Sequence, residues 1–207
     1  MLHNQNLIDE VNALLRKLVP IQTHEGSATT VRGPSLEIQQ EVPKRLLGIS
    51  NESMESRANV IEALVKVLDN PKAKKGFGIT HKWLTAVDVL GRLRAIEAID
   101  VLIKNIDETD QRLTMVYVFH GPAVAALARI GEPAVPKLVE ALFNKKASVR
   151  REAAYTLGLI GGGEAEAALR KAQKIEKNKD VVHFIEAALP TEAPQILPAI
   201  AVERVKE

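Results

Sequence analysis

Apolar residues recur along the first part of the chain at the spacing of amphipathic helices. Six of them share one helical stripe between residues 6 and 18, with Asn6 as a suitable N-cap: Leu7, Ile8, Val11, Leu14, Leu15 and Leu18. Residues 36–49 are weakly patterned and are expected to contain a helix that starts at Pro43. The segment SNESMESRANVIEALVKVLDNP predicts a clear helix, which begins at polar capping residues and ends before Pro71.

Farther along, the chain repeats one pattern. Three stretches align with one another: AVDVLGRLRAIEAIDVLIKNI, AVAALARIGEPAVPKLVEAL and AAYTLGLIGGGEAEAALRKA. Their equivalent leucines, Leu90, Leu127 and Leu157, are separated by 37 and then 30 residues. Each stretch reads as helix, turn and helix, and a period in this range is typical of an α-solenoid. Since one unit cannot bury its own apolar face, neighbouring units are expected to stack.

Three consecutive glycines, residues 161–163, raise the alternative of a phosphate-binding turn before a helix. Their spacing fails the G-x-G-x-x-G pattern because residue 166 is Glu, and neither Lys-Ser nor Lys-Thr follows them. Arg94-Ala95 and Gly131-Glu132 hold the same place in the other two units. The glycines are therefore predicted to form the turn between two antiparallel helices, where a helix often ends in a left-handed residue.

ARIGEPAVPKLVEAL followed by ASVRREAAYTLGLIGG resembles HEAT repeats, in particular the short bacterial HEAT-like repeats of the phycobilin-lyase type. The resemblance extends over residues 57–189. Ala153-Ala154 is similar to the small residues of the family's first helix, and Val149-Arg150 to its Val-Arg pair. The resemblance implies an all-α fold, a right-handed α-solenoid of about four HEAT-like helix–turn–helix repeats.

One part of the family pattern differs in this chain. HEAT repeats usually carry Asp residues in the turn before the Val-Arg pair, and these bond across repeats to the arginine. Here the turn reads Asn144-Lys145-Lys146-Ala147. The polar ladder is therefore predicted to be weakened or absent, with apolar stacking setting the register of the repeats.

Two segments lack the helical pattern. Residues 20–35, PIQTHEGSATTVRGPS, are rich in Gly, Ser, Thr and Pro and are predicted to form a linker or loose loop. The tail after residue 189 is expected to cover the exposed end of the stack or to serve as a peptide for another protein. The predicted organisation is an N-terminal helix at 1–19, a linker at 20–35, a repeat domain at 36–189 and a tail at 190–207.

The second helix of each unit carries an apolar stripe, and the resemblance implies that these helices line the concave face. The stripes are Ile99, Leu102, Ile103 and Ile106; Val135, Leu138, Val139 and Leu142; and Ala165, Ala168, Leu169 and Ala172. The equivalent outward positions are Lys104, Glu140 and Arg170. Their signs alternate, which argues against a continuous basic groove for nucleic acid and is also compatible with a plain solvated face.

Two long connections, residues 69–83 and 107–122, carry four of the seven aromatic residues. Long irregular segments on a rigid scaffold favour binding, and aromatic side chains dominate interface hot spots. Trp83 is in register with a helix and is predicted to lie in the core. The expected partner-binding residues are Tyr117, Phe119, His120, Phe77, Lys104, Glu140 and Arg170, with Tyr117 and Phe119 as anchors.

The composition excludes several classes of chemistry. The chain of 207 residues has 28 basic and 26 acidic residues and a net charge of +2, so it lacks the strong positive charge of a typical nucleic-acid binder. It has no cysteine, which excludes disulfides, thiolate zinc sites and a thiol nucleophile. No apolar run reaches the length of a membrane span. The N-terminus is unlike a signal peptide, which favours the cytoplasm, although a removed leader would leave secretion open.

No pattern of catalytic or metal-binding residues emerges, so no enzyme activity, cofactor or metal is predicted. The five histidines lack the i, i+4 spacing of a helical metal pair, and one His24-Glu25 pair cannot make the iron site of HEAT-like hydroxylases. Arg151, Glu152 and Tyr155 could form a site, but they fit helix surface and packing better. A further cluster contains Arg170, Lys171, Lys174, Lys177 and Lys179, with Glu164, Glu166 and Glu176 interleaved, and is expected to be a solvated helix face.

The predicted function is a non-enzymatic scaffold that binds another protein or peptide on its concave face and long loops. An accessory subunit of an enzyme complex, lyase-like or chaperone-like, is the alternative. Nucleic-acid binding is the third choice, and steep salt dependence of a DNA affinity would mark it.

Overall fold

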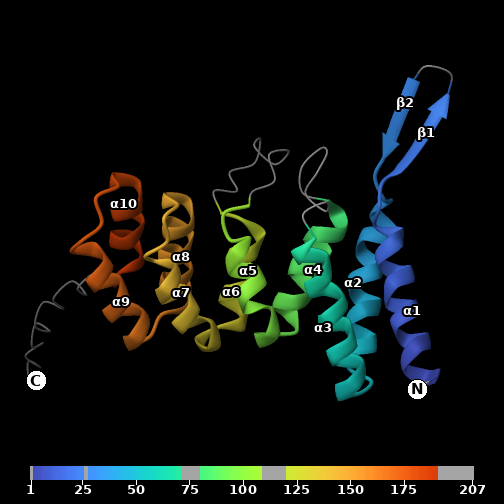
Figure 1. Ribbon diagram of the computed structural model, residues 1–207, viewed down its shortest axis with the longest axis horizontal. Helices are drawn as coiled ribbons and strands as arrows, with labels where there is room; N and C mark the ends of the chain where they lie inside the picture. The colour runs from blue at the N-terminus through green and yellow to red at the C-terminus, as the bar shows by residue number, and fades with distance from the viewer. Residues whose placement is uncertain (1, 26–27, 71–79, 109–119, 191–207) are drawn as a thin grey trace, which may run out of the picture.

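The structure, a computed structural model, describes residues 2–25, 28–70, 80–108 and 120–190. Helices stand side by side in one long row from the N-terminus to the C-terminal end (Figure 1). The α-helices in the described residues are α1 (Leu2–Lys17), α2 (Leu36–Ser50), α3 (Met54–Asp69), α4 (His81–Arg92), α5 (Ile99–Lys104), α6 (Pro122–Ile130), α7 (Val135–Ala141), α8 (Ala147–Ile160), α9 (Gly163–Gln173) and α10 (Lys179–Ala188). Short 3₁₀ turns, Ile96–Ala98 and Glu132–Ala134, lead into α5 and α7.

The helices alternate between two layers. In one layer α2, α4, α6, α8 and α10 pack on one another in sequence, and in the other α3, α5, α7 and α9 do the same. The pairs α2–α3, α4–α5, α6–α7 and α8–α9 are helix–turn–helix units, and α10 packs on α8 as the next helix of the first layer. The prediction of an all-α solenoid of stacked repeats is confirmed.

The core follows the repeated apolar positions. Leu90, Leu127 and Leu157 are fully buried, as are most residues of the second-helix stripes. Close helix contacts depend on small residues: a Cβ on Gly91 would lie 2.7 Å from the Ala126 backbone, so α4 and α6 touch there. The stack is thus held mainly by apolar burial between layers and between neighbouring units.

The turns within the repeats confirm the prediction for the glycine run. Gly131 and Gly161 have φ values of 81° and 72°, and Arg94 occupies the equivalent place with a φ of 49°. The amide of Gly161 donates to the carbonyl of Leu157 at 2.8 Å, which ends α8. Three successive units therefore reverse direction at an equivalent left-handed residue.

The N-terminal helix packs directly on the repeats. It begins at Leu2, earlier than the predicted cap at Asn6, and it contacts both α2 and α3. Its side chains Val11, Leu14 and Leu15 are buried, together with Leu18 just after the helix. The apolar stripe predicted between residues 6 and 18 therefore faces the stack.

Two expectations for the region before α3 differ from the structure. The predicted linker contains the antiparallel strands β1 (Ile21–Glu25) and β2 (Ala28–Arg32), in a register that pairs Thr23 with Thr30. Its β-branched residues favour strands, which a count of Gly, Ser and Pro overlooks. Pro43 was predicted at a helix start and instead lies inside α2, which begins at Leu36 after the cap Ser35.

Within the ranges described above, no helix combines the length and the apolar character needed to cross a bilayer. The tail predicted to cover the stack or bind a partner falls, after Pro190, outside the described residues.

Candidate functional site

The ends of the helices form two edges of the row. One edge carries the C-terminal ends of α3, α5, α7 and α9 and the N-terminal ends of α4, α6, α8 and α10, and we name it the inter-repeat edge. The strands β1 and β2 extend from this side of the molecule, at the top of Figure 1. Each repeat's second helix ends here and the first helix of the next repeat begins here, so polar groups at this edge can link one repeat to the next.

Ion pairs and hydrogen bonds join neighbouring repeats along the inter-repeat edge. Lys104 Nζ at the end of α5 lies 2.6 Å from Asp69 Oδ1 at the end of α3. Ser148 Oγ donates to Asp107 Oδ2 at 2.7 Å, and Lys146 Nζ lies 3.7 Å from the same oxygen. Side chains about one repeat apart in sequence therefore meet at this edge.

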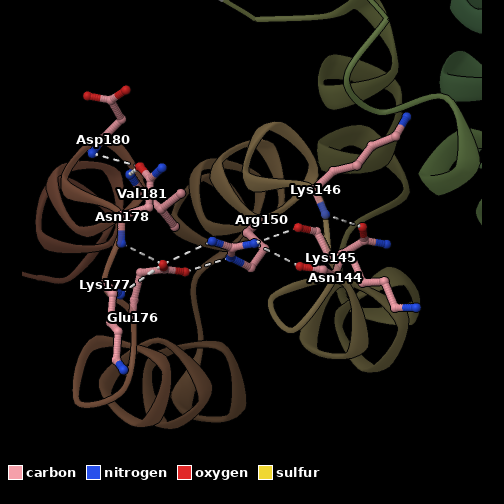
Figure 2. A network of polar contacts seen from close by, with 9 residues as sticks. All are labelled: Asn144, Lys145, Lys146, Arg150, Glu176, Lys177, Asn178, Asp180 and Val181. Carbon is pink, nitrogen blue, oxygen red and sulfur yellow. Dashed lines mark hydrogen bonds and ion pairs between the residues drawn. The ribbon is translucent and has the colours of Figure 1, made fainter.

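Arg150 makes the most extensive of these links (Figure 2). Its Nε and Nη2 donate to the two carboxylate oxygens of Glu176 at 2.6 and 3.0 Å. Its Nη1 donates to the carbonyl oxygens of Asn144 at 2.9 Å and Lys145 at 3.2 Å. One guanidinium thus ties the turn before α8 to the turn before α10. The predicted loss of the polar ladder is wrong at this position, because backbone carbonyls and the next turn's glutamate replace the missing Asp.

Glu176 is held in its charged form by this network. The hydrogen bonds from Arg150 lower the pKa of Glu176 from 4.5 to about 2, helped by the amides of Asn178 and Lys177 and opposed by burial. The side chain of Glu176 is only 9% exposed, so solvent screens the pair weakly.

The depressed pKa of Glu176 predicts a pH-dependent contribution to stability. A shift from 4.5 to about 2 corresponds to about 3 kcal/mol, present above pH 4.5 and lost as the pH falls toward 2. Urea unfolding of the wild type and of Glu176→Gln should differ by about this amount near neutral pH, and the difference should shrink steadily below pH 4.5. An equal difference at both ends of this range would show that the carboxylate charge contributes nothing.

A second polar cluster lies on α8 and α10, next to His120 before α6. Glu152 on α8 is fully buried, and its Oε2 accepts a hydrogen bond from His120 Nδ1 at 2.8 Å. Its Oε1 accepts from Arg151 Nε at 3.1 Å and from Arg151 Nη2 at 2.9 Å. A buried carboxylate with two partners is fixed in place and in turn positions His120, two residues before α6.

Aromatic rings surround this pair. His120 stacks on Tyr155 with ring centres 3.5 Å apart and planes 6° apart. Phe184 on α10 meets both rings edge-on, with centres 5.5 Å from His120 and 6.2 Å from Tyr155. The Arg151 guanidinium lies 5.6 Å from the centre of the Phe184 ring. The cluster therefore joins α8 and α10 to His120, which lies just before α6.

Comparison with known proteins identifies the repeats. Residues 121–190 match the model of the family described as HEAT repeats. The match spans the units α6–α7 and α8–α9 together with α10, and it confirms the resemblance drawn from the sequence.

Several solved structures align with the chain at low similarity. An engineered protein is 21% identical over 90% of this chain and 84% of its own, with a TM-score of 0.39. A second engineered protein is 22% identical over 87% of this chain and 47% of its own, with a TM-score of 0.37. A designed armadillo repeat protein in complex with the peptide (KR)4 is 20% identical over 89% of this chain and 83% of its own, with a TM-score of 0.37. No curated protein matches the chain.

The predicted binding residues take different places in the structure. Phe77, Tyr117 and Phe119 lie outside the described residues. His120 belongs to the cluster around Glu152, where it is four-fifths buried. Packing therefore holds His120 in place, and about a fifth of its side chain remains exposed to solvent.

The three outward charges predicted on the second helices are exposed, and each has a local partner. Lys104 on α5 pairs with Asp69 of the preceding unit. Glu140 on α7 lies 3.4 Å from Lys137 of the same helix, and Arg170 on α9 lies 2.7 Å from Glu166. They lie on successive helices of one layer but do not contact one another. Exposed pairs of this kind contribute little to stability and are easily exchanged for other partners.

Two functional features escaped the sequence analysis. Glu152 was assigned with its neighbours to helix surface and packing, and the structure buries it against His120, 32 residues earlier in the chain. Glu176 was counted as a neighbour that neutralises lysines, and Arg150 binds it instead. Trp83, by contrast, is fully buried, so its predicted place in the core is confirmed.

Proposed function

We propose that this protein is a non-enzymatic scaffold that binds another protein or a peptide. The observation that supports the proposal is the stack itself. Its HEAT units line up the second helices α5, α7 and α9 in one layer, and exposed side chains of both signs, Lys104, Glu140 and Arg170, stand on them. A row of pre-formed helices offers a partner a large surface at little cost in ordering.

Specificity in this proposal comes from charge, and affinity from apolar anchors. Lys104, Glu140 and Arg170 can exchange their local partners for groups of a bound protein, because exposed ion pairs are weak. Tyr117 and Phe119 supply the anchors, in the connection that leads to His120.

The test is a capture experiment with the full chain as bait. Tyr117→Ala/Phe119→Ala is expected to lose a partner that the wild type recovers from lysate of the source cells, because hot-spot truncations cost about 2 kcal/mol or more each. The matched control is Met54→Ala, which removes an apolar side chain that is 90% exposed at the start of α3. Circular dichroism and thermal melts must show all three proteins equally folded.

The outcomes separate the possible modes of binding. Loss of the partner from the double variant alone, confirmed by isothermal titration with the purified partner, supports the scaffold and its anchors. Equal recovery by all three proteins contradicts the role of Tyr117 and Phe119. A DNA affinity that falls steeply with salt would favour nucleic-acid binding over the scaffold.

A further inference from the structure

The last two repeats carry an apolar groove on the inter-repeat edge. Phe143 lies in the turn after α7 and Ile175 in the turn after α9, and they are 46% and 60% exposed. Leu142 and Ala172 line the groove between them. Ile106, which the stripe alignment places with Leu142 and Ala172, is buried as they are. Phe143 and Ile175 lie beyond the buried stripes, so their side chains remain exposed at the edge.

The Arg150 network forms the wall of this groove. Arg150 and Glu176 both line it, and their hydrogen bonds hold the turn with Asn144 and Lys145 against the turn with Lys177 (Figure 2). Phe143 and Ile175 are thus carried by two turns that are fastened together. A groove with a fixed shape needs little rearrangement to bind a ligand.

Lysines are concentrated in and beside the two turns that carry the groove, and Lys177 lines it. The turns 142–146 and 174–178 contain four lysines, Lys145, Lys146, Lys174 and Lys177, against one carboxylate, that of Glu176. Lys171 adds a fifth cation, with its Nζ 5.9 Å from the centre of the Phe143 ring. The next acidic residue along the chain after these lysines is Asp180, which is exposed in the first turn of α10.

The glutamates interleaved in the sequence do not balance these lysines. Glu176 is bound by Arg150, and Glu166 by Arg170. Glu164 lies at the opposite end of α9. Lys146 reaches Asp107 at 3.7 Å, but within the described ranges no carboxylate lies within ion-pair distance of Lys145, Lys171, Lys174 or Lys177. The rim of the groove is therefore positive and its centre apolar.

We propose that this groove binds an acidic segment of a partner protein, which inserts an apolar side chain between Phe143 and Ile175. The inference rests on the proposed scaffold function and names the chemistry of one partner. The apolar side chain supplies affinity by burying surface that is otherwise exposed to water, and the lysines select for acidic flanks and speed the encounter. A nucleic acid would satisfy the lysines but would leave the apolar centre unused.

A peptide selection tests this directly. Random short peptides displayed on phage are selected on the full-length wild type, and enriched peptides are synthesised and measured by fluorescence anisotropy. We expect enriched sequences to combine acidic residues with a large apolar residue. Phe143→Ser/Ile175→Ser and Lys174→Glu/Lys177→Glu should each weaken binding at least tenfold, and added salt should weaken it further.

Matched controls make the same chemical changes elsewhere. Leu36→Ser/Met54→Ser removes two exposed apolar side chains near the other end of the stack. Lys17→Glu/Lys44→Glu makes the same change of charge on α1 and α2. All four substituted positions of the groove are exposed, so the variants are expected to fold, and thermal melts verify this.

Several results would overturn the inference. These are a selection without acidic enrichment, peptides that bind the groove variants as well as the wild type, and a single-stranded oligonucleotide that binds this rim more tightly than any peptide. Self-association that the groove variants abolish would assign the surface to a second copy instead. If these results are found and Tyr117→Ala/Phe119→Ala still loses its captured partner, the scaffold proposal is supported and the groove proposal is wrong. If no partner and no peptide binds, both proposals fail.

Discussion

Trp83→Ala is expected to destabilise the protein by about 3–5 kcal/mol. Trp83 is the largest of the fully buried side chains and lies in the first turn of α4. This helix packs against α2, α3 and α6, so the cavity would open at the junction between the N-terminal helices and the repeats that follow. Urea unfolding measures the effect as a lower midpoint with an unchanged slope.

Trp83→Phe is the control that separates packing from hydrogen bonding. The buried Nε1 of Trp83 has no hydrogen-bond partner among the described residues. Phe keeps a ring in the core and removes this unpaired donor, so its cost should be well below that of Ala. Equal costs for Phe and Ala would contradict the packing argument. A change in slope would indicate that the N-terminal helices unfold separately, as weakly coupled repeats can.

The repeated architecture could be predicted from the sequence because it depends on local periodicity. Leu90, Leu127 and Leu157 are equivalent in the alignment and are all buried. Aligning the units also located the turn residues Arg94 and Gly161, which share a left-handed backbone. Such features recur in each unit, so one unit predicts the next.

The features that sequence analysis missed depend on partners from distant parts of the chain or on an exception to a local rule. Glu152 has the polarity of a surface residue, and only the approach of His120 from another unit explains its burial. Glu176 adjoins lysines in sequence, yet its carboxylate bonds to Arg150. Pro43 is tolerated inside α2 although proline usually marks the start of a helix. Helical periodicity contains no information about such pairings.

Glu152→Ala is expected to cost about 1–3 kcal/mol, because it leaves the partly buried donors of His120 and Arg151 without their acceptor. Glu152→Gln keeps the shape and one acceptor oxygen, so it should cost less. A double-mutant cycle with His120→Ala isolates the energy of the His120–Glu152 contact. Additive effects of the two substitutions would show that the 2.8 Å contact contributes no coupling.

The Glu152→Gln substitution also tests whether this contact supports the proposed binding. Glu152 fixes His120, and His120 directly follows the connection that carries Tyr117 and Phe119. At a temperature where Glu152→Gln remains folded, its affinity for a partner captured through these anchors should therefore fall, while peptides bound at the Phe143–Ile175 groove should be unaffected. Titrations of both ligands on one variant measure the difference. A loss of both affinities would mean that Glu152 supports the whole end of the stack rather than the position of His120.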